Sequence, residues 1–355
     1  MLIDLWRRHG ARTAESGDRE TVRGFTSLEE EHRALTSGWA LADRSSVEAL
    51  ELRGEDRVRF LNGQLTCDIA ALEVGRGVYG FFTNHQGRVL SDGGILALAD
   101  RLLVELPPQA GERMAEQLGK YIIADRVELA VPEGLSQIVV AGARSEERLS
   151  GLVDLPPDGA WSHGEVELGG ERLLAVRHPR LGVPAVALWA EEGPLRAAAE
   201  ALLEGAAGDA PALVGEEGLE AVRVEAGTPR FGHDFSDENF PQETGVEGAV
   251  SYSKGCYLGQ EVVARIHYRG QVNRVLRGLR FDGEEPPVPG TELLLDGRAV
   301  GKVGSAVRSV RLGAPIGLAI VHRRGAEPGT RLELGGGGVA EVTDTRAAAG
   351  SAGRG

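Results

Sequence analysis

The chain has 355 residues, of which 42% are hydrophobic and 26% charged, a composition typical of a globular protein with two or three domains. Its formal net charge of −14 disfavours broad binding to the phosphate backbone of nucleic acids. The two cysteines, Cys67 and Cys256, lie far apart in sequence, which argues against a disulfide scaffold, a structural zinc site and a self-contained iron–sulfur cluster.

No stretch of the chain is apolar and long enough to span a bilayer, and residues 1–10 have the wrong order for a secretory signal. We therefore expect a cytoplasmic protein with no membrane partner. Residues 11–24 are polar, so residues 1–24 are expected to form a mobile N-terminal segment.

Short helical and strand patterns alternate through the first two thirds of the chain. Residues 26–34 predict a helix that is capped by Thr26 or Ser27. Residues 79–83 and 88–99 predict two strands around the turn at 84–87. Further helices are predicted over 109–121, 145–152, 194–203 and 216–226. Because the strands between them lack regular βαβ spacing, the pattern indicates α+β lobes.

The pattern changes after Asn273, where only strand signals remain. They cover residues 275–281, 292–295, 299–307, 316–321, 331–334 and 339–343. Residues 273–345 are therefore predicted to form a small antiparallel barrel or sandwich, and residues 346–355 a disordered tail.

The segment 253–261, with the sequence SKGCYLGQE, is the most informative in the chain. It places Cys256 beside Lys254 and just before a helix that we expect to start after Gly259. A nearby ammonium and the amide groups of a helix start both favour a thiolate over a thiol. The alternative is a small buried hydrophobe in a glycine-rich turn. Cys67 follows an amphipathic helical pattern and is interpreted as structural.

Asp92 lies within an apolar strand pattern, where a carboxylate must find a hydrogen-bond partner or shift its pKa. It is a candidate to bind the amino-pyrimidine edge of a pterin or to polarise an amine. The alternative is a strand-end aspartate that accepts hydrogen bonds from the amides of the neighbouring glycines.

Arg223 lies between two valines on the helix predicted over 216–226, so it is a candidate for a partly buried guanidinium that binds a carboxylate or a heterocycle. The alternative is a salt bridge to Glu220 or Glu225 within the helix. No histidine pair has metal-ligand spacing, and no metal site is expected. A basic groove at residues 265–277 is possible, but a solvated face is the simpler interpretation.

Four stretches together resemble the folate-binding family that contains the T-protein (aminomethyltransferase) of the glycine cleavage system and the YgfZ-type proteins. The first stretch is residues 41–45 followed by 60–66, and the second is residues 83–92. The third is residues 222–232, leading to Pro241 and Glu243, and the fourth is residues 254–261. In the last stretch, the combination similar to YgfZ-type proteins consists of Lys254, Gly255, Cys256, Tyr257, Gly259, Gln260 and Glu261.

The chain departs from T-proteins at three places. They carry an aromatic residue in place of Cys256, two adjacent acids where this chain has Ser91 and Asp92, and a Tyr-Thr-Gly-Glu segment where it has residues 180–184. These departures disfavour aminomethyl transfer as the activity.

The resemblance implies a GcvT-like cloverleaf. Residues 25–272 would form two interleaved α+β lobes that bind tetrahydrofolate or a derivative, and the C-terminal β-barrel would follow. It also implies that Asp92 and Arg223 face the folate.

We therefore expect a tetrahydrofolate-binding accessory protein in iron–sulfur cluster assembly or repair that indirectly supports tRNA modification and uses Cys256 and Lys254. Its partners would be iron–sulfur client enzymes or cluster-assembly proteins, and direct nucleic-acid binding is not expected. The alternative is a folate-dependent aminomethyltransferase.

Overall fold

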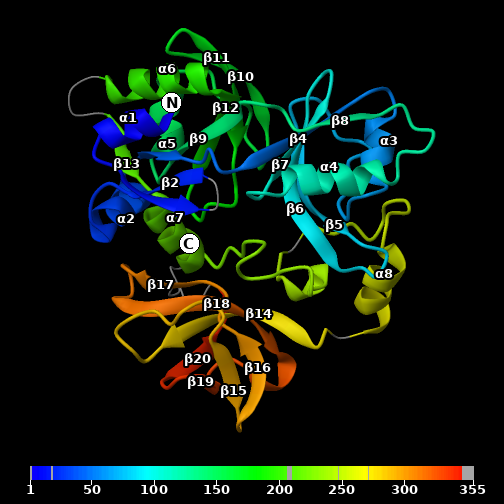
Figure 1. Cartoon of the computed structure of the whole chain (residues 1–355), viewed down its shortest axis with the longest axis vertical. Helices are drawn as coiled ribbons and strands as arrows, with labels where there is room; N and C mark the ends of the chain where they lie inside the picture. Colours follow the sequence, from blue (N-terminus) through cyan, green and yellow to red (C-terminus); the bar gives the residue numbers. More distant parts are fainter. Residues whose placement is uncertain (1, 17–18, 206–209, 247, 271, 346–355) are drawn as a thin grey trace. The chain divides into compact units, whose positions relative to one another are not determined.

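The computed structural model describes residues 2–16, 19–205, 210–246, 248–270 and 272–345 (Figure 1). The expected disordered tail at 346–355 lies outside these residues. The chain forms two compact units. Unit 1 comprises Met1–Gly80 and Asp92–Leu219, and unit 2 comprises Phe81–Ser91 and Glu220–Gly355. This division differs from the expected boundary at 272, because a hairpin tip and the segment from Glu220 group with the C-terminal strands.

The N-terminal residues correct the expectation of a mobile segment over residues 1–24. They form helix α1 (Leu2–Arg8) and the antiparallel strands β1 (Arg12–Ser16) and β2 (Arg19–Gly24). Leu2, Leu5 and Trp6 lie on one side of α1 and are buried in the core of unit 1. The polar composition of the hairpin was misleading because a two-stranded ribbon needs few buried positions; in β2 the only buried apolar side chain is that of Val22.

Unit 1 contains a six-stranded sheet in the order β10-β11-β12-β9-β3-β13. The strands are β3 (Ala40–Asp43), β9 (Leu135–Ala141), β10 (His163–Leu168), β11 (Glu171–Arg177), β12 (Ala185–Glu191) and β13 (Ala212–Val214). Only the β3–β13 pair is parallel. Helices α1, α5 (Ser145–Ser150) and α6 (Glu192–Leu203) pack on one face of this sheet. Helix α2 (Leu28–Ser37) contacts β13, and its predicted cap, Ser27, forms a capping box with Glu30.

A second sheet has the order β5-β6-β7-β4-β8. Its strands are β4 (Glu48–Arg53), β5 (Gly77–Thr83), β6 (Val89–Ala97), β7 (Leu102–Leu106) and β8 (Glu128–Ala130). Helix α3 (Arg57–Asn62) follows β4, and helix α4 (Gly111–Gly119) contacts β4 and β8. The tip of the β5–β6 hairpin, residues 81–91, belongs to unit 2.

The two sheets share a buried layer inside unit 1. Alternation along β9 sends Ile138 and Val140 into the core beneath the helices, so Gln137 and Val139 point to the opposite face. On that side a cluster joins side chains of both sheets, namely Val47, Ala49, Leu96, Leu103, Trp161, Val176, Ala187 and Trp189. Polar side chains on these inner faces are therefore enclosed between two layers of strands.

In unit 2, helix α7 (Glu216–Glu225), which begins in unit 1, buries Val224 against Leu276, Ile316 and Leu318. A long irregular segment follows, interrupted by the short helix η1 (Pro241–Glu243) and ended by α8 (Gln260–Arg269).

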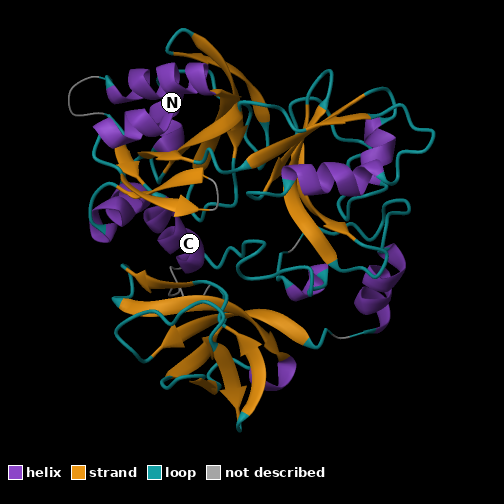
Figure 2. Cartoon of the chain, in the orientation of Figure 1, coloured by secondary structure: helices purple, strands orange, loops and turns teal. Residues whose placement is uncertain are grey.

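The C-terminal strands form an antiparallel barrel (Figure 2). They are β14 (Arg274–Phe281), β15 (Glu292–Leu295), β16 (Arg298–Lys302), β17 (Ala306–Ser309), β18 (Ala314–His322), β19 (Arg331–Leu334) and β20 (Val339–Thr343), with η2 (Arg323–Gly325) after β18. Pairing of β14 with β18 closes a ring of six strands, and β17 adds to its edge. The expected class, α+β lobes followed by a C-terminal antiparallel barrel, is confirmed.

The strand predicted over 299–307 is divided into β16 and β17. The ladder is irregular at residues 303–305, because Gly304 and Ser305 both hydrogen-bond to the backbone of Leu318 in β18. The backbone N–H of Ser305 donates instead to Oδ1 of Asp234 at 2.9 Å, a contact with a distant segment that no local pattern reveals.

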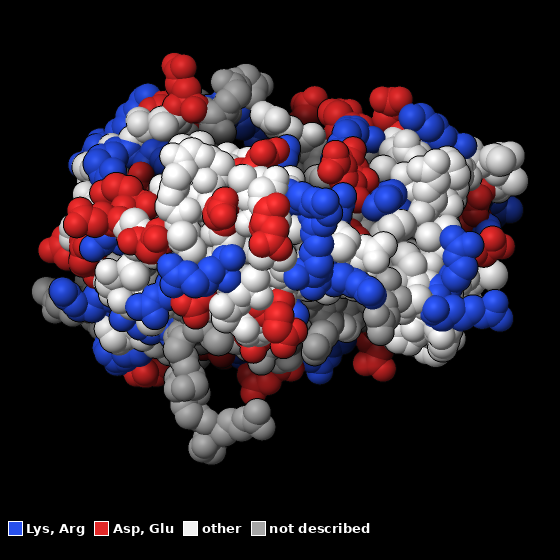
Figure 3. Space-filling model, turned by 90° about the horizontal axis from the view of Figure 1, so that it is seen from below, with Lys and Arg blue, Asp and Glu red and all other residues white. Residues whose placement is uncertain are grey.

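Charged side chains of both signs are interspersed on the face in Figure 3, as expected for a chain with 39 basic and 53 acidic residues. Within the described residues, we find no helix that combines the length and the apolar character needed to cross a bilayer.

Candidate functional site

Asp92 is a buried carboxylate in the middle of β6, with 7% of its surface exposed. It shares the inner face of the strand with Gly94 and Leu96. The alternative expectation placed Asp92 at the end of a strand, and it is wrong because Asp92 lies inside β6. The hydroxyl of Tyr79, on the neighbouring strand β5, donates to Oδ2 of Asp92. Burial raises the pKa of Asp92, and Arg180 opposes that shift.

Aromatic rings and a guanidinium enclose Asp92 and Tyr79. The ring of Trp161 stacks on that of Tyr79, with 6.2 Å between centroids and 12° between planes. The guanidinium carbon of Arg180 lies 4.0 Å from the centroid of the Tyr79 ring. Burial, followed by the charge of Asp92, raises the pKa of Tyr79 well above its usual value, so the hydroxyl keeps its proton. These groups form a flat aromatic wall beside a carboxylate.

A second buried carboxylate, Glu105 of β7, lies on the same inner face, because β7 pairs it with Gly94 of β6. Nε2 of Gln137 donates to Glu105 Oε2 at 2.9 Å, and Nε2 of His178 lies 2.9 Å from Glu105 Oε1. Arg44 approaches the same Oε1 at 3.5 Å. Burial alone would raise the pKa of Glu105, but the charge of Arg44 and the hydrogen bonds from His178 and Gln137 outweigh it and lower that pKa.

His178 is neutral in this network. Its Nδ1 accepts a hydrogen bond from the backbone N–H of Arg180 at 3.3 Å, so the ring proton lies on Nε2 and points to Glu105. Burial lowers the pKa of His178, which agrees with that assignment. The contact between His178 and Glu105 is therefore a hydrogen bond from a neutral imidazole to a carboxylate.

The sequence analysis did not single out Tyr79, Glu105, His178 or Arg180. One signal was present for Glu105, an acid inside the otherwise apolar strand LLVEL. Of the other three side chains, Tyr79 lies about a hundred residues from His178 and Arg180, so they become neighbours only through the packing of the two sheets.

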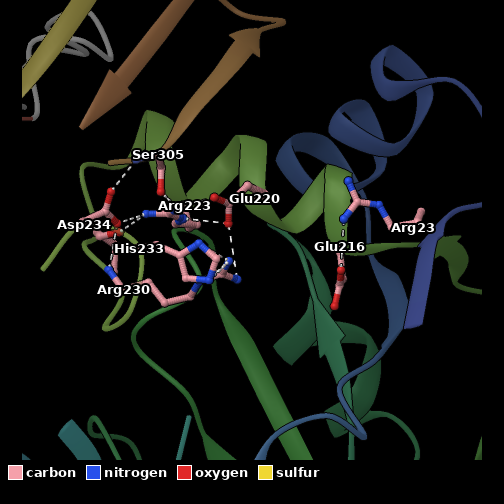
Figure 4. A network of polar contacts seen from close by, with 9 residues as sticks. Arg23, Glu216, Glu220, Arg223, Arg230, His233, Asp234 and Ser305 are labelled. Atoms are coloured by element: carbon pink, nitrogen blue, oxygen red, sulfur yellow. Dashed lines mark hydrogen bonds and ion pairs between the residues drawn. The ribbon is translucent and has the colours of Figure 1, made fainter. Parts of the chain in front are cut away.

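Arg223 requires a correction, because all five N–H groups of its guanidinium are used within unit 2 (Figure 4). Nε donates to Glu220 at 2.9 Å, and Nη1 donates to the carbonyl of Thr228 at 3.1 Å and to Asp234. Nη2 donates to Glu220 and to Ser305. The salt bridge to Glu220, held open as an alternative, is present. The guanidinium has no donor left for a heterocycle, so its role is to join α7 to the following loop and to the barrel.

The segment around Cys256 sits on the tip of the β5–β6 hairpin. Helix α8 begins at Gln260, as predicted, and Gly259 before it has φ +82°. A Cβ at Gly259 would lie 2.4 Å from the carbonyl oxygen of Asn84, so only glycine fits there. The hydroxyl of Thr83 donates to the carbonyl of Leu258 at 2.6 Å. These contacts fix the segment that carries Cys256.

Within this segment, Cys256 is exposed, whereas Cys67 is buried as expected for a structural cysteine. Lys254 is 8% exposed, and its Nζ lies 5.3 Å from the ring centroid of Tyr257. Tyr257 is itself buried, and burial raises its pKa. Lys254 and Tyr257 thus anchor the loop from inside.

The two ends of the segment are polar. Nε2 of Gln260 donates to the carbonyl of Gly255 at 3.4 Å, and Glu261 is exposed in the first turn of α8. The interpretation of Cys256 as a small buried hydrophobe is therefore wrong, and its thiol is accessible to solvent.

The predicted site residues fall into two groups. Asp92 belongs to unit 1, whereas Arg223, Lys254 and Cys256 belong to unit 2. In the described part of the chain, no cluster of three or more His, Cys, Asp or Glu side chains is arranged to hold a metal ion.

Two family profiles match the chain. The GCVT N-terminal domain matches residues 2–254, and the glycine cleavage T-protein C-terminal barrel domain matches residues 274–346. A solved structure, the glycine cleavage system aminomethyltransferase T from Bartonella henselae, is similar with a TM-score of 0.85 at 20% identity, covering 97% of this chain and 96% of that chain.

Curated relatives carry different names. The Bacillus subtilis protein named aminomethyltransferase is 25% identical over 94% of this chain and 93% of its own length. That of Geobacillus kaustophilus is 29% identical with the same coverage. The tRNA-modifying protein YgfZ of Sodalis glossinidius is 30% identical over 69% of this chain and 72% of its own length.

Proposed function

Because the chain belongs to the glycine cleavage T-protein family, we propose that it binds tetrahydrofolate or a derivative at Asp92 and supports iron–sulfur cluster assembly or repair through Cys256. The observation that carries the proposal is the exposed thiol of Cys256 within the sequence KGCYLGQE.

The buried surroundings of Asp92 suit a pterin. An amino-pyrimidine edge presents parallel N–H donors, and a carboxylate accepts two of them in one plane. The stacked rings of Tyr79 and Trp161 supply a flat wall of the kind on which heterocycles pack. A buried carboxylate also gains more from such a pair than an exposed one, because water no longer competes.

Cys256 suits chemistry on another protein. Its side chain is exposed, and neighbouring Gly255 has no atom within 4 Å of the place a Cβ would take, so a client can approach the loop. An accessible thiol can ligate iron of a cluster intermediate through its sulfur, or it can attack a disulfide of a client, forming a mixed disulfide and releasing the client's other sulfur as a thiol. Clients would be iron–sulfur enzymes, including enzymes that modify tRNA.

The ligand half of the proposal is tested by titration with tetrahydrofolate. Asp92→Asn keeps the shape of the side chain but replaces one acceptor oxygen with a donor, so we expect at least a tenfold loss of affinity. Asp100→Asn, an exposed aspartate, is the matched control and should bind like the wild type. Equal binding by Asp92→Asn would place the folate elsewhere.

The thiol half is tested in cells that lack the gene. The wild-type gene should restore the activity of an iron–sulfur enzyme, and Cys256→Ser should not. Cys67→Ala, at the buried cysteine, is expected to restore it. Full rescue by Cys256→Ser would refute the thiol role and leave folate binding untouched.

Aminomethyl transfer is the second candidate. It is favoured by the names of relatives that match the chain from end to end. It is disfavoured by Ser91, which stands where T-proteins carry the first of two acids. In a test with an aminomethyl donor and tetrahydrofolate, formation of methylene-tetrahydrofolate that depends on Asp92 and not on Cys256 would establish it.

A further inference from the structure

Three polar or amphipathic side chains form a row across the inner face of the six-stranded sheet. Gln137 of β9 is the Cα partner of Trp189 of β12. On its other side, the backbone N–H of Arg44, directly after β3, donates to the carbonyl of Gln137 at 3.0 Å. Side chains of directly opposed residues leave a sheet on the same face, with Cβ atoms about 4.5–5.5 Å apart. All three residues belong to unit 1.

Two buried polar atoms in this row lack a hydrogen-bond partner among the described residues. They are Oε1 of Gln137, an acceptor, and Nε1–H of Trp189, a donor. Gln137 is fully buried and Trp189 is 2% exposed. An unsatisfied buried donor or acceptor destabilises the folded state. Finding one of each on opposed residues points to a shared partner.

The orientation of the Gln137 amide is fixed by Glu105. Nε2 donates to Glu105 Oε2 at 2.9 Å, and a flipped amide would instead bring two acceptor oxygens together. The unsatisfied Oε1 is therefore a true acceptor, and it needs a donor other than Glu105.

We propose that Gln137 and Trp189 bind a single buried water molecule. Such a water accepts the indole N–H of Trp189 and donates to Oε1 of Gln137, so one small neutral molecule satisfies both atoms. A cation is excluded by the indole N–H, which can only donate, and an anion by the amide oxygen, which can only accept. Polar sites of this kind retain water, and conserved buried waters typically make two to four hydrogen bonds.

The water completes a chain of contacts from one sheet to the other. It holds the amide of Gln137, which donates to Glu105, and Glu105 in turn accepts from His178. The bound water is thus part of the polar network next to Asp92 and does not depend on the proposed function.

A crystal structure of the full chain provides the direct test. We expect density for a water within about 2.7–3.2 Å of both Gln137 Oε1 and Trp189 Nε1. A direct hydrogen bond between the two side chains, or a dry contact, would overturn the proposal.

NMR of the indole N–H groups gives an independent readout in solution. The chain has four tryptophans, so each indole signal is assigned by a Trp→Phe variant. The Trp189 indole should show a cross-peak to a long-lived water, and Gln137→Met, similar in size but without the amide, should remove it. Persistence of the cross-peak in Gln137→Met would show that Gln137 does not hold the water.

Urea unfolding of Trp189→Phe, Gln137→Met and the double variant completes the test. A shared water predicts that the two losses do not add, because either change alone releases it. Trp6→Phe is the matched control, since Trp6 is a buried tryptophan of the same unit that lies outside the row of Arg44, Gln137 and Trp189. The loss of stability caused by Trp6→Phe should add fully to the loss caused by Gln137→Met. Additive losses for the Trp189 pair would contradict a common ligand.

Discussion

Gly94 lies directly beneath the indole ring of Trp161. A Cβ at Gly94 would be 2.2 Å from Cζ3 of that ring, so the ring reaches its place only because position 94 has no side chain. The same ring stacks on Tyr79, whose hydroxyl donates to Asp92. A glycine of β6 therefore sets the geometry of the carboxylate two residues before it.

Gly94→Ala is expected to displace Trp161 and to destabilise the protein by about 1–3 kcal/mol, because the added methyl group overpacks the layer between the sheets. Folate affinity should fall with it. Urea unfolding and folate titration measure the two effects. Gly193→Ala in α6, where a Cβ would meet no atom within 4 Å, should leave both unchanged or stabilise slightly. If Gly94→Ala has the stability and folate affinity of the wild type, the position of Trp161 does not determine the geometry around Asp92.

Arg223→Lys is expected to cost about 3–5 kcal/mol, although it keeps the positive charge. Lysine has three donors where arginine uses five, and Asp234, whose side chain is 0% exposed, loses the guanidinium that neutralises its charge. The free energy of unfolding in urea measures the loss. Arg196→Ala, which breaks a surface pair with Glu200, should cost no more than about 0.5 kcal/mol. A small effect at Arg223 would contradict its structural role.

Acidification should destabilise unit 1 through His178 and Glu105. The pKa of His178 is lowered in the folded chain, so the unfolded chain binds its proton first and stability falls as the pH drops below about 6.5. The pKa of Glu105 is lowered from 4.5 in the folded chain, so its contribution is complete above pH 4.5 and is lost as the pH falls through the lowered pKa.

Glu105→Gln tests this dependence. The variant should be less stable than the wild type at neutral pH, and the difference should shrink towards pH 2, which urea unfolding across pH measures. Glu116→Gln, at an exposed residue of α4, should follow the wild-type curve. A constant difference between Glu105→Gln and the wild type would show that ionisation of Glu105 does not contribute.

The two cysteines should differ in their reaction with iodoacetamide. Cys256 is exposed and is expected to be alkylated in the folded chain, whereas Cys67 should react only after unfolding. Peptide mapping by mass spectrometry measures both rates. Equal rates under native conditions would contradict the packing of Cys67, which lies against Gly80.

Gly259→Ala should change the rate of Cys256 alkylation. The left-handed backbone costs alanine about 1–2 kcal/mol, and its Cβ would clash with the carbonyl of Asn84, so the loop must move. Gly255→Ala, where a Cβ has open space, is the matched control and should react like the wild type. An unchanged rate in Gly259→Ala would mean that contact with the hairpin tip does not position the thiol.

Local patterns were sufficient for much of the chain. Strands β15, β19 and β20 begin and end at the predicted residues, because alternating apolar positions and the turns between them are encoded within a few residues. The start of α8 was likewise predicted correctly from Gly259. For the two buried acids, Asp92 and Glu105, the sequence shows an acid within an apolar strand. It does not show which side chains that acid contacts.

By itself, the sequence determined the α+β class, the C-terminal barrel and the identity of the two candidate side chains, Asp92 and Cys256. Tertiary structure alone decided that Arg223 is committed to Glu220, Thr228, Asp234 and Ser305, and that Tyr79 and Arg180 enclose Asp92. The physical reason is that periodicity records which face a residue occupies. The donor or acceptor it meets on that face can come from a segment far away in the sequence, and only folding brings the two together.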